Sequence, residues 1–254
     1  MNSKACLLLF VLFLSFGVTA QNDSIKANKT VLIQSDLNII TYLTEKDSTI
    51  YYNEDESLAK YFSIELIDQK LYSVKKKKAI SFLLADTLAH KKTNGIITLL
   101  CQKKTVTFTD LPSEEETHRV YEYIGQINLL NAYVVYGMYW EDYDFTLIDK
   151  TSGERTTSFV NYPNIAADKK KIICLGANVY ENITDMDFFV IDKNKTTNVT
   201  SVGFKYWMSA GEITDMFWSN DGYFYLPVLA SNNFWKPDGN LNDQWQYIRI
   251  KPIP

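Results

Sequence analysis

A short segment that occurs twice with the same internal spacing limits the fold of this chain more than any other feature. Residues 144–150 read DFTLIDK and residues 187–193 read DFFVIDK, so the copies align without a gap. Each copy is an apolar run that ends in Ile-Asp-Lys and is followed by a polar turn and Thr-rich residues. Repeats of about 40–45 residues are typical of four-stranded units. We therefore predict an all-β fold with four-stranded repeats.

A second element, a polar turn between two β-prone runs, also recurs. One such turn is centred on Asp168 and another on Asp221. The stretch Trp-Ser-Asn-Asp-Gly at 218–222 resembles turns of the WD-repeat and TolB-like β-propeller class, in which an apolar residue precedes Ser-Pro-Asp-Gly-Lys and an apolar strand follows. Asn220 stands where proline is usual, and the turn at Asp168 lacks the glycine.

The resemblance covers the C-terminal half of the chain and implies about three propeller-like blade units. Their approximate bounds are 120–159, 160–202 and 204–250, and residues 247–250 are expected to form the last outer strand. A closed propeller typically needs about four to eight blades. The fold expected is therefore a partial or irregular propeller, or one that degenerate blades from the N-terminal region complete.

Three regions are expected along the chain. Residues 1–20 are a signal peptide, residues 21–115 a β-rich N-terminal region packed against the repeats, and residues 116–254 the propeller-like region. The boundary is placed after Pro112, where three glutamates follow one another. A run of like charges beside a proline is typical of a solvated linker.

Within the N-terminal region the chain favours short strands. Residues 37–43 and 49–52 are rich in β-branched and aromatic residues, and residues 96–100 and 105–109 predict a hairpin. Residues 57–71 fit either a helical stripe or an alternating strand, so the sequence leaves this segment open.

The N-terminus carries a secretory signal. Lys4 precedes an unbroken apolar run at residues 7–14, and Val18-Thr19-Ala20 offers small residues before Gln21. An uncleaved anchor is the alternative, but the run is shorter than the ~20 residues that span a bilayer. We expect a secreted or periplasmic protein, a bacterial cell envelope being the favoured setting, with no transmembrane segment after cleavage.

The charge balance argues against nucleic acid as a partner. The chain has 26 Lys and Arg against 30 Asp and Glu, whereas nucleic-acid binding depends on neutralising phosphates. The four lysines at 75–78 are the exception, and a solvated loop or the guard of an edge strand is favoured over a binding patch.

Two cysteines remain after signal cleavage, Cys101 and Cys174. An oxidising compartment would permit a disulfide between them. Both lie in apolar runs, where a cysteine often serves as a small buried hydrophobe. The sequence leaves both readings open.

Two segments are candidate binding sites. The first combines aromatic rings with carboxylates, namely Tyr136, Tyr139, Trp140, Glu141 and Asp142. Such rings offer flat apolar platforms with polar edges, suited to sugars or to a protein partner. The alternative is that the rings fill space between repeats and the acids lie in a turn. Asp185 and Asp215 recur in comparable places, which favours a repeated structural turn.

The second candidate is the loop at 231–245, in which Asn233 and Trp235 are the residues singled out. Long loops on β scaffolds often carry binding residues. A loop that only covers one end of the repeats is the alternative.

No local motif for nucleophilic, metal-dependent or nucleotide chemistry occurs in the chain, so no cofactor, metal ligand or catalytic residue is predicted. The favoured function is a non-catalytic binding protein with a protein or glycan partner. One alternative is a carbohydrate-active enzyme using Glu141, Asp142 or Asp185 as general acid or base. Another is an inhibitor or immunity-type protein.

Overall fold

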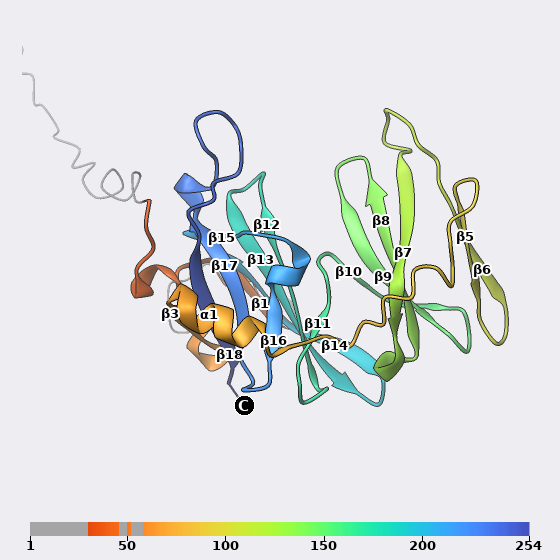
Figure 1. Cartoon of the computed structure of the whole chain (residues 1–254), viewed down its shortest axis with the longest axis horizontal. Helices are drawn as coiled ribbons and strands as arrows, with labels where there is room; N and C mark the ends of the chain where they lie inside the picture. Colours follow the sequence, from red (N-terminus) through yellow and green to blue (C-terminus); the bar gives the residue numbers. More distant parts are fainter. Residues whose placement is uncertain (1–29, 46–49, 52–57, 254) are drawn as a thin grey trace, which may run out of the picture.

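A computed structural model describes residues 30–45, 50–51 and 58–253. Over these residues the chain is all-β, as predicted, with several antiparallel sheets and none of them closed (Figure 1). The expected signal peptide, residues 1–20, lies outside the described residues. In the described part of the chain, every helix is too short or too polar to cross a membrane.

The first sheet is an up-and-down meander with the order β10-β9-β8-β7. Its strands are β7 (Arg119–Ile127), β8 (Ala132–Tyr139), β9 (Tyr143–Asp149) and β10 (Arg155–Phe159). A short 3-10 helix, η3 (Asn128–Leu130), links β7 to β8, and Asn131 after it adopts the left-handed conformation. The unit coincides closely with the first repeat expected from the sequence.

The second sheet continues the same pattern. Its meander comprises β11 (Asn164–Ile165), β12 (Lys171–Asn178), β13 (Ile183–Asp192) and β14 (Lys195–Phe204). The two copies of the sequence repeat lie in β9 and β13, each the third strand of its meander. β1 (Ile40–Glu45) and β2 (Ile50–Tyr51) extend this sheet beyond β14.

The third sheet has the order β3-β18-β17-β16-β4, and β15 also pairs with β17. Its strands from the C-terminal half are β15 (Trp207–Ser209), β16 (Phe217–Ser219), β17 (Phe224–Ala230) and β18 (Gln246–Pro252). The N-terminal half adds β3 (Phe62–Ile67) and β4 (Ala79–Ile80). Residues 247–250, expected as the last outer strand, instead lie within β18, because β3 pairs along its free edge from Phe62↔Pro252 to Ile67↔Tyr247.

The segment that the sequence left open holds both kinds of element. η2 (Leu58–Lys60) precedes β3, and α1 (Gln69–Lys76) follows it, with Asp68 capping the helix through a bond from the Leu71 amide (2.6 Å). Lys75 and Lys76 therefore end a helix, whereas Lys77 and Lys78 form the turn that precedes the edge strand β4. Lys75 pairs with Asp221 and Lys76 with Asp215, which ties α1 to the third sheet.

The predicted hairpin is confirmed, with β5 at Ile96–Leu100 and β6 at Thr105–Thr109. It packs against the first sheet through a small apolar cluster. Ile97, Leu99 and Phe108 from the hairpin meet Tyr123, Val135 and Ile148. Two strands alone bury little surface, so the hairpin depends on its contacts with the first sheet, which are this cluster and hydrogen bonds such as those from the Gln102 and Lys103 amides to the Lys150 and Thr151 carbonyls.

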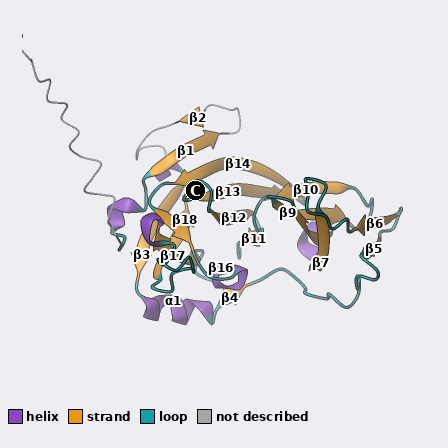
Figure 2. Cartoon of the chain, turned by 90° about the horizontal axis from the view of Figure 1, so that it is seen from above, coloured by secondary structure: helices purple, strands orange, loops and turns teal. Residues whose placement is uncertain are grey.

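The second sheet lies between the other two and shares a core with each (Figure 2). Toward the third sheet, Phe188 meets Phe62 edge to face at 5.2 Å. Toward the first sheet, Phe189 meets Phe159 at 4.9 Å. Consecutive residues of β13 thus face opposite sides of the sheet, as the two-residue period of a strand requires.

A connection after β4 runs from the third sheet to the first. Leu84 exchanges two backbone hydrogen bonds with Gln126 of β7, at 2.9 and 3.0 Å. Gly125 permits this approach, since a Cβ there would lie 2.4 Å from the Leu84 carbonyl oxygen and its φ is +140°. Residues before and after residue 115 are therefore hydrogen-bonded to each other here, as they also are where β1, β3 and β4 join the second and third sheets.

Candidate functional site

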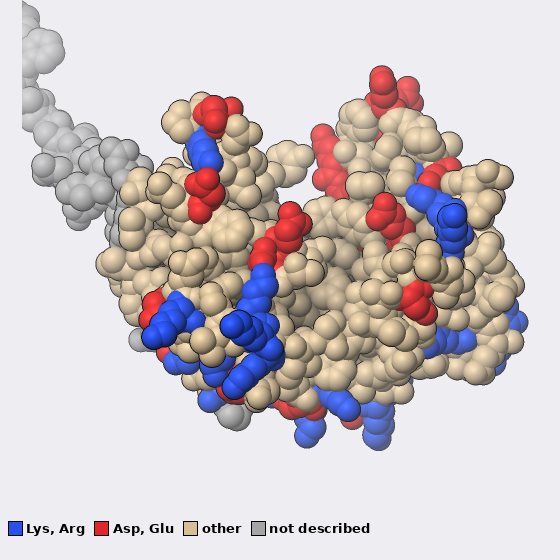
Figure 3. All heavy atoms as spheres, viewed as in Figure 1, with Lys and Arg blue, Asp and Glu red and all other residues tan. Residues whose placement is uncertain are grey.

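A cleft of about 640 Å³ opens where the three sheets approach one another. Figure 3 shows the hollow between the two halves of the molecule, with acidic side chains on both of its sides. Its volume falls within the ~300–1,000 Å³ of typical ligand sites. The cleft has two unlike walls, which the fold explains.

The first wall is aromatic and belongs to the first sheet. Glu122, Tyr136 and Phe145 are directly opposite one another on β7, β8 and β9, so they form one row on one face. The rings of Tyr136 and Phe145 are 5.0 Å apart, and the ring of Tyr143 lies 6.0 Å from Tyr136. Burial first, and then the charge of Glu122, raises the pKa of Tyr136, which keeps that hydroxyl neutral.

The facing wall contains a run of small residues beside larger apolar ones such as Leu175, Met216 and Phe234. The small residues are Gly176 and Ala177 on β12, Ser209 at the end of β15, and Ala210 and Gly211 directly after it. Short side chains opposite large rings leave the volume between them open. Gly211 has φ +80°, a conformation that favours glycine, and it precedes Glu212 and Ile213 at the edge of the cleft.

A polar contact joins two residues that line the cleft. The Tyr143 hydroxyl donates to Asn161 Oδ1 at 2.8 Å. Gly176 makes room for that amide, because a Cβ there would lie 1.9 Å from Asn161 Oδ1. Tyr162, which is half-buried, also lines the cleft.

The first candidate segment of the sequence divides at the end of β8. Tyr136 lines the cleft. Tyr139 does not line it, and its hydroxyl donates to Asp144 Oδ1 at 3.0 Å. Trp140, Glu141 and Asp142 form the exposed β8–β9 turn, where Asp142 Oδ1 accepts from the Tyr143 amide at 2.7 Å.

The second candidate segment lies beside the same cleft. Phe234 and Leu241 line it, and Trp235, next to Phe234, is 48% exposed and pairs with Leu241 through a backbone bridge. Asn233 does not line the cleft; its amide donates to the Thr30 carbonyl at 3.3 Å. The two loops chosen from the sequence therefore flank one cavity.

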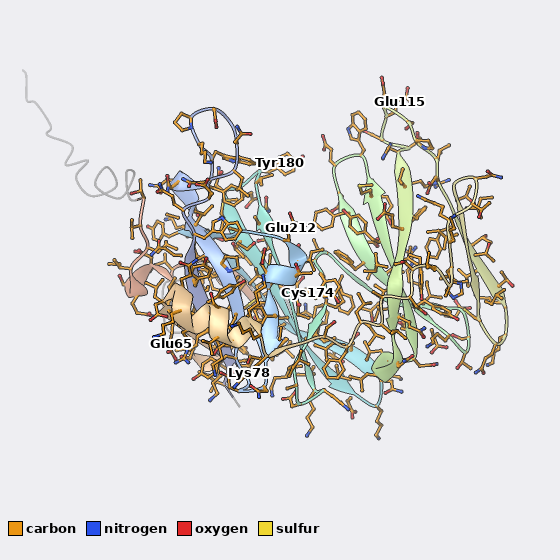
Figure 4. The ribbon with its side chains drawn as sticks, viewed as in Figure 1. Glu65, Lys78, Glu115, Cys174, Tyr180 and Glu212 are labelled. Atoms are coloured by element: carbon orange, nitrogen blue, oxygen red, sulfur yellow. The ribbon has the colours of Figure 1, made fainter. Side chains whose placement is uncertain are left out.

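A third loop also lies near the cleft. The β12–β13 turn carries Tyr180, which is 78% exposed, and the strand before it contributes Gly176 and Ala177 to the cleft. Figure 4 shows Tyr180 and Glu212 extending from the second and third sheets into the space that faces the first sheet. Exposed rings thus come from one loop of each sheet.

Asp185 and Asp187 of β13 lie outside the cleft, in a separate polar cluster. Asp185 accepts from the Tyr42 hydroxyl at 2.8 Å and from Asn178 Nδ2 at 3.0 Å. Asp187 accepts from the Ser201 hydroxyl at 2.5 Å. Glu141 and Asp142 are exposed in their turn, so the three carboxylates considered as general acids or bases do not share one pocket.

The disulfide that the sequence allowed is not formed: Cys101 and Cys174 are free thiols. Cys101 follows β5 beside the hairpin cluster, whereas Cys174 is fully buried in β12 between the first and second sheets. Burial raises the pKa of the Cys174 thiol, so it acts as a small hydrophobe.

Most residues of the cleft were not selected by the sequence analysis, and among them are the polar residues Glu122, Ser209 and Glu212. Glu122 had a readable signal, since it is an acid that alternates with ring and β-branched residues in a strand-like run. Ser209 is 4% exposed, and its hydroxyl has no hydrogen-bond partner among the described residues. Buried polar atoms usually have a partner.

No cluster of three or more His, Cys, Asp or Glu side chains able to hold a metal ion is present in the described ranges. Comparison with protein-family models, with curated proteins and with solved structures finds no match for this chain. The chemistry of the cleft therefore has to be read from its own residues.

Proposed function

We propose that this chain is a non-catalytic glycan-binding protein of the cell envelope, in which the three larger sheets act as blades of an open propeller around the ligand. The observation that carries the proposal is the cleft itself. A row of tyrosine and phenylalanine rings faces a wall that includes five small residues, and Trp140, Tyr180 and Trp235 stand exposed on the flanking loops. Rings with polar edges suit the apolar faces and hydroxyls of sugars.

The acids that the sequence offers for catalysis are not gathered in the cleft, which favours binding. Asp185 lies outside it, bonded to Tyr42 and Asn178, and within it Asn161 is already bonded to Tyr143. The apolar run before Gln21 supports a location outside the cytoplasm. Sugars of the envelope or of the surroundings would then be within reach.

Isothermal titration of the mature protein with a panel of neutral, acidic and amine-bearing tetrasaccharides tests the proposal. We expect at least one sugar to bind without being hydrolysed, and Trp140→Ala or Trp235→Ala to weaken binding about tenfold. Both rings are half exposed, so their loss leaves the core intact.

Tyr223→Ala is the matched control, because Tyr223 lies beyond the opposite end of β17 from the loop that carries Trp235. It should bind like the unaltered protein. Binding of no sugar in the panel, binding that neither tryptophan affects, or turnover of the bound sugar would each overturn the proposal.

A further inference from the structure

The charges that line the cleft have one sign. Glu122 lies on the aromatic wall and Glu212 at the edge of the opposite wall. Of the described residues, no Lys, Arg or His lines the cleft, and neither glutamate forms a salt bridge within the described ranges. Two carboxylates facing one cavity without a cation create a field that attracts positive charge.

The aromatic wall adds to that field. Glu122 is the direct cross-strand neighbour of Tyr136, and the Tyr136 ring contacts the rings of Phe145 and Tyr143. The faces of such rings are electron-rich and attract ammonium groups. A carboxylate and an aromatic face therefore meet at the same point of the wall.

A further group in the opposite wall lacks its partner. Ser209 lines the cleft and is only 4% exposed. Its hydroxyl oxygen has no hydrogen bond to any described residue. Thr184 Oγ1 accepts from the Ser209 amide at 2.8 Å, which fixes the backbone. The hydroxyl oxygen is itself enclosed by protein, so Ser209 adds an unsatisfied polar group to this wall rather than a contact open to the ligand.

We propose that the ligand is a cationic amino sugar, whose free ammonium lies between Glu122 and Glu212 while its ring packs on the tyrosine wall. This inference rests on the proposed function and narrows it from glycans in general to sugars that carry an unacetylated amine. Acidic sugars are excluded from the cleft by the same two carboxylates.

Titration with a glucosamine tetramer and with the N-acetylglucosamine tetramer of equal length tests the inference. At about pH 6 amines of this class carry a proton, and we expect the glucosamine tetramer to bind about tenfold more tightly. The preference should shrink in 1 M NaCl, which screens exposed charges to about 3 Å, and tetramethylammonium chloride should compete with the ligand.

Glu122→Gln and Glu212→Gln should each reduce the preference several-fold, and the double variant should abolish it. Glu115→Gln and Glu181→Gln are matched controls, since both are exposed acids that do not line the cleft. Preference for the acetylated sugar, or a preference that survives the double variant, overturns this inference and leaves glycan binding intact. Binding of neither tetramer nor any other sugar overturns both.

Discussion

Asp187 is a partly buried acid whose ionised form disfavours the folded state. Its carboxylate lies on the face of β13 that also presents Asp185, and it accepts from the Ser201 hydroxyl. Burial raises the pKa of Asp187 most strongly; the Ser201 hydrogen bond lowers it and the charge of Asp185 raises it again, leaving it above the ordinary value. Ionised Asp187 therefore destabilises the folded state.

We expect Asp187→Asn to raise the free energy of unfolding at pH 7. An acid whose folded-state pKa is raised contributes its full stability below the unfolded-state value near 4, and loses it as the pH rises through the folded-state pKa. The amide keeps the shape and an acceptor for Ser201, so the gain over the unaltered protein should grow from about pH 4 to pH 7. Urea denaturation across that range measures it.

Asp221→Asn is the control with the opposite sign. Burial disfavours the charge of Asp221, but bonds from Lys75 (2.6 Å) and the Tyr225 hydroxyl (2.8 Å) outweigh burial and lower its pKa. Its stabilisation is present above the unfolded-state value and lost in acid, so this variant should be less stable at pH 7. A loss of stability in Asp187→Asn at neutral pH would contradict the explanation given for Asp187.

Among the elements, the β5–β6 hairpin forms a sheet of its own and packs on the first sheet through a small apolar cluster. Leu99 is fully buried against the first sheet, whereas its neighbour Leu100 is 67% exposed. Adjacent residues of a strand face opposite sides. Replacing each of the two leucines in turn therefore compares the same side-chain loss with and without the packing contact.

We expect Leu99→Ala to lower the free energy of unfolding by about 2–5 kcal/mol, the usual cost of a buried Leu→Ala change. Leu100→Ala should stay within about 0.5 kcal/mol of the unaltered protein. Equal effects at the two positions in chemical denaturation would mean that the hairpin does not pack on the first sheet.

The same hairpin shows what the sequence can predict. Its two strands alternate, and a short turn joins them, so local pattern was enough to give both bounds. The segment copied at 144 and 187 was likewise readable, because each copy carries its own turn residues. Local signals of this kind do not depend on the rest of the fold.

Pairing between distant strands was not readable in the same way. β3 joins β18 and β4 joins β16, yet nothing in the composition of 62–67 selects a partner near the C-terminus. The residues of the cleft also divide into those that local sequence reveals and those that only the pairing of distant strands brings into place. Tyr136 was identified from its aromatic surroundings, while Ser209 and Glu212 become part of the site only when the third sheet is placed against the second.

At the scale of the whole molecule, the sheets do not respect the boundary expected at residue 115. β1 pairs with β14, and Leu43, Phe62 and Ile64 belong to the core that the second and third sheets share. We therefore predict that a fragment of residues 116–254 does not fold alone. Circular dichroism should show no cooperative melting.

Co-expression of residues 21–115 as a separate chain should restore a folded complex, because it returns β1, β3 and β4 to their sheets. Cooperative unfolding of the isolated 116–254 fragment would show instead that these strands only decorate a self-sufficient unit.

The pairing of β3 with β18 also has a kinetic consequence. Phe62 meets Pro252 in the register, so β3 cannot pair with β18 until the ribosome has passed residue 252. Contacts between residues this far apart in sequence require closing a long loop, and folding rates fall as such contacts dominate. An early strand of the third sheet therefore stays without this partner while β4 to β17 are synthesised, and the sheet is completed only when β18 becomes available.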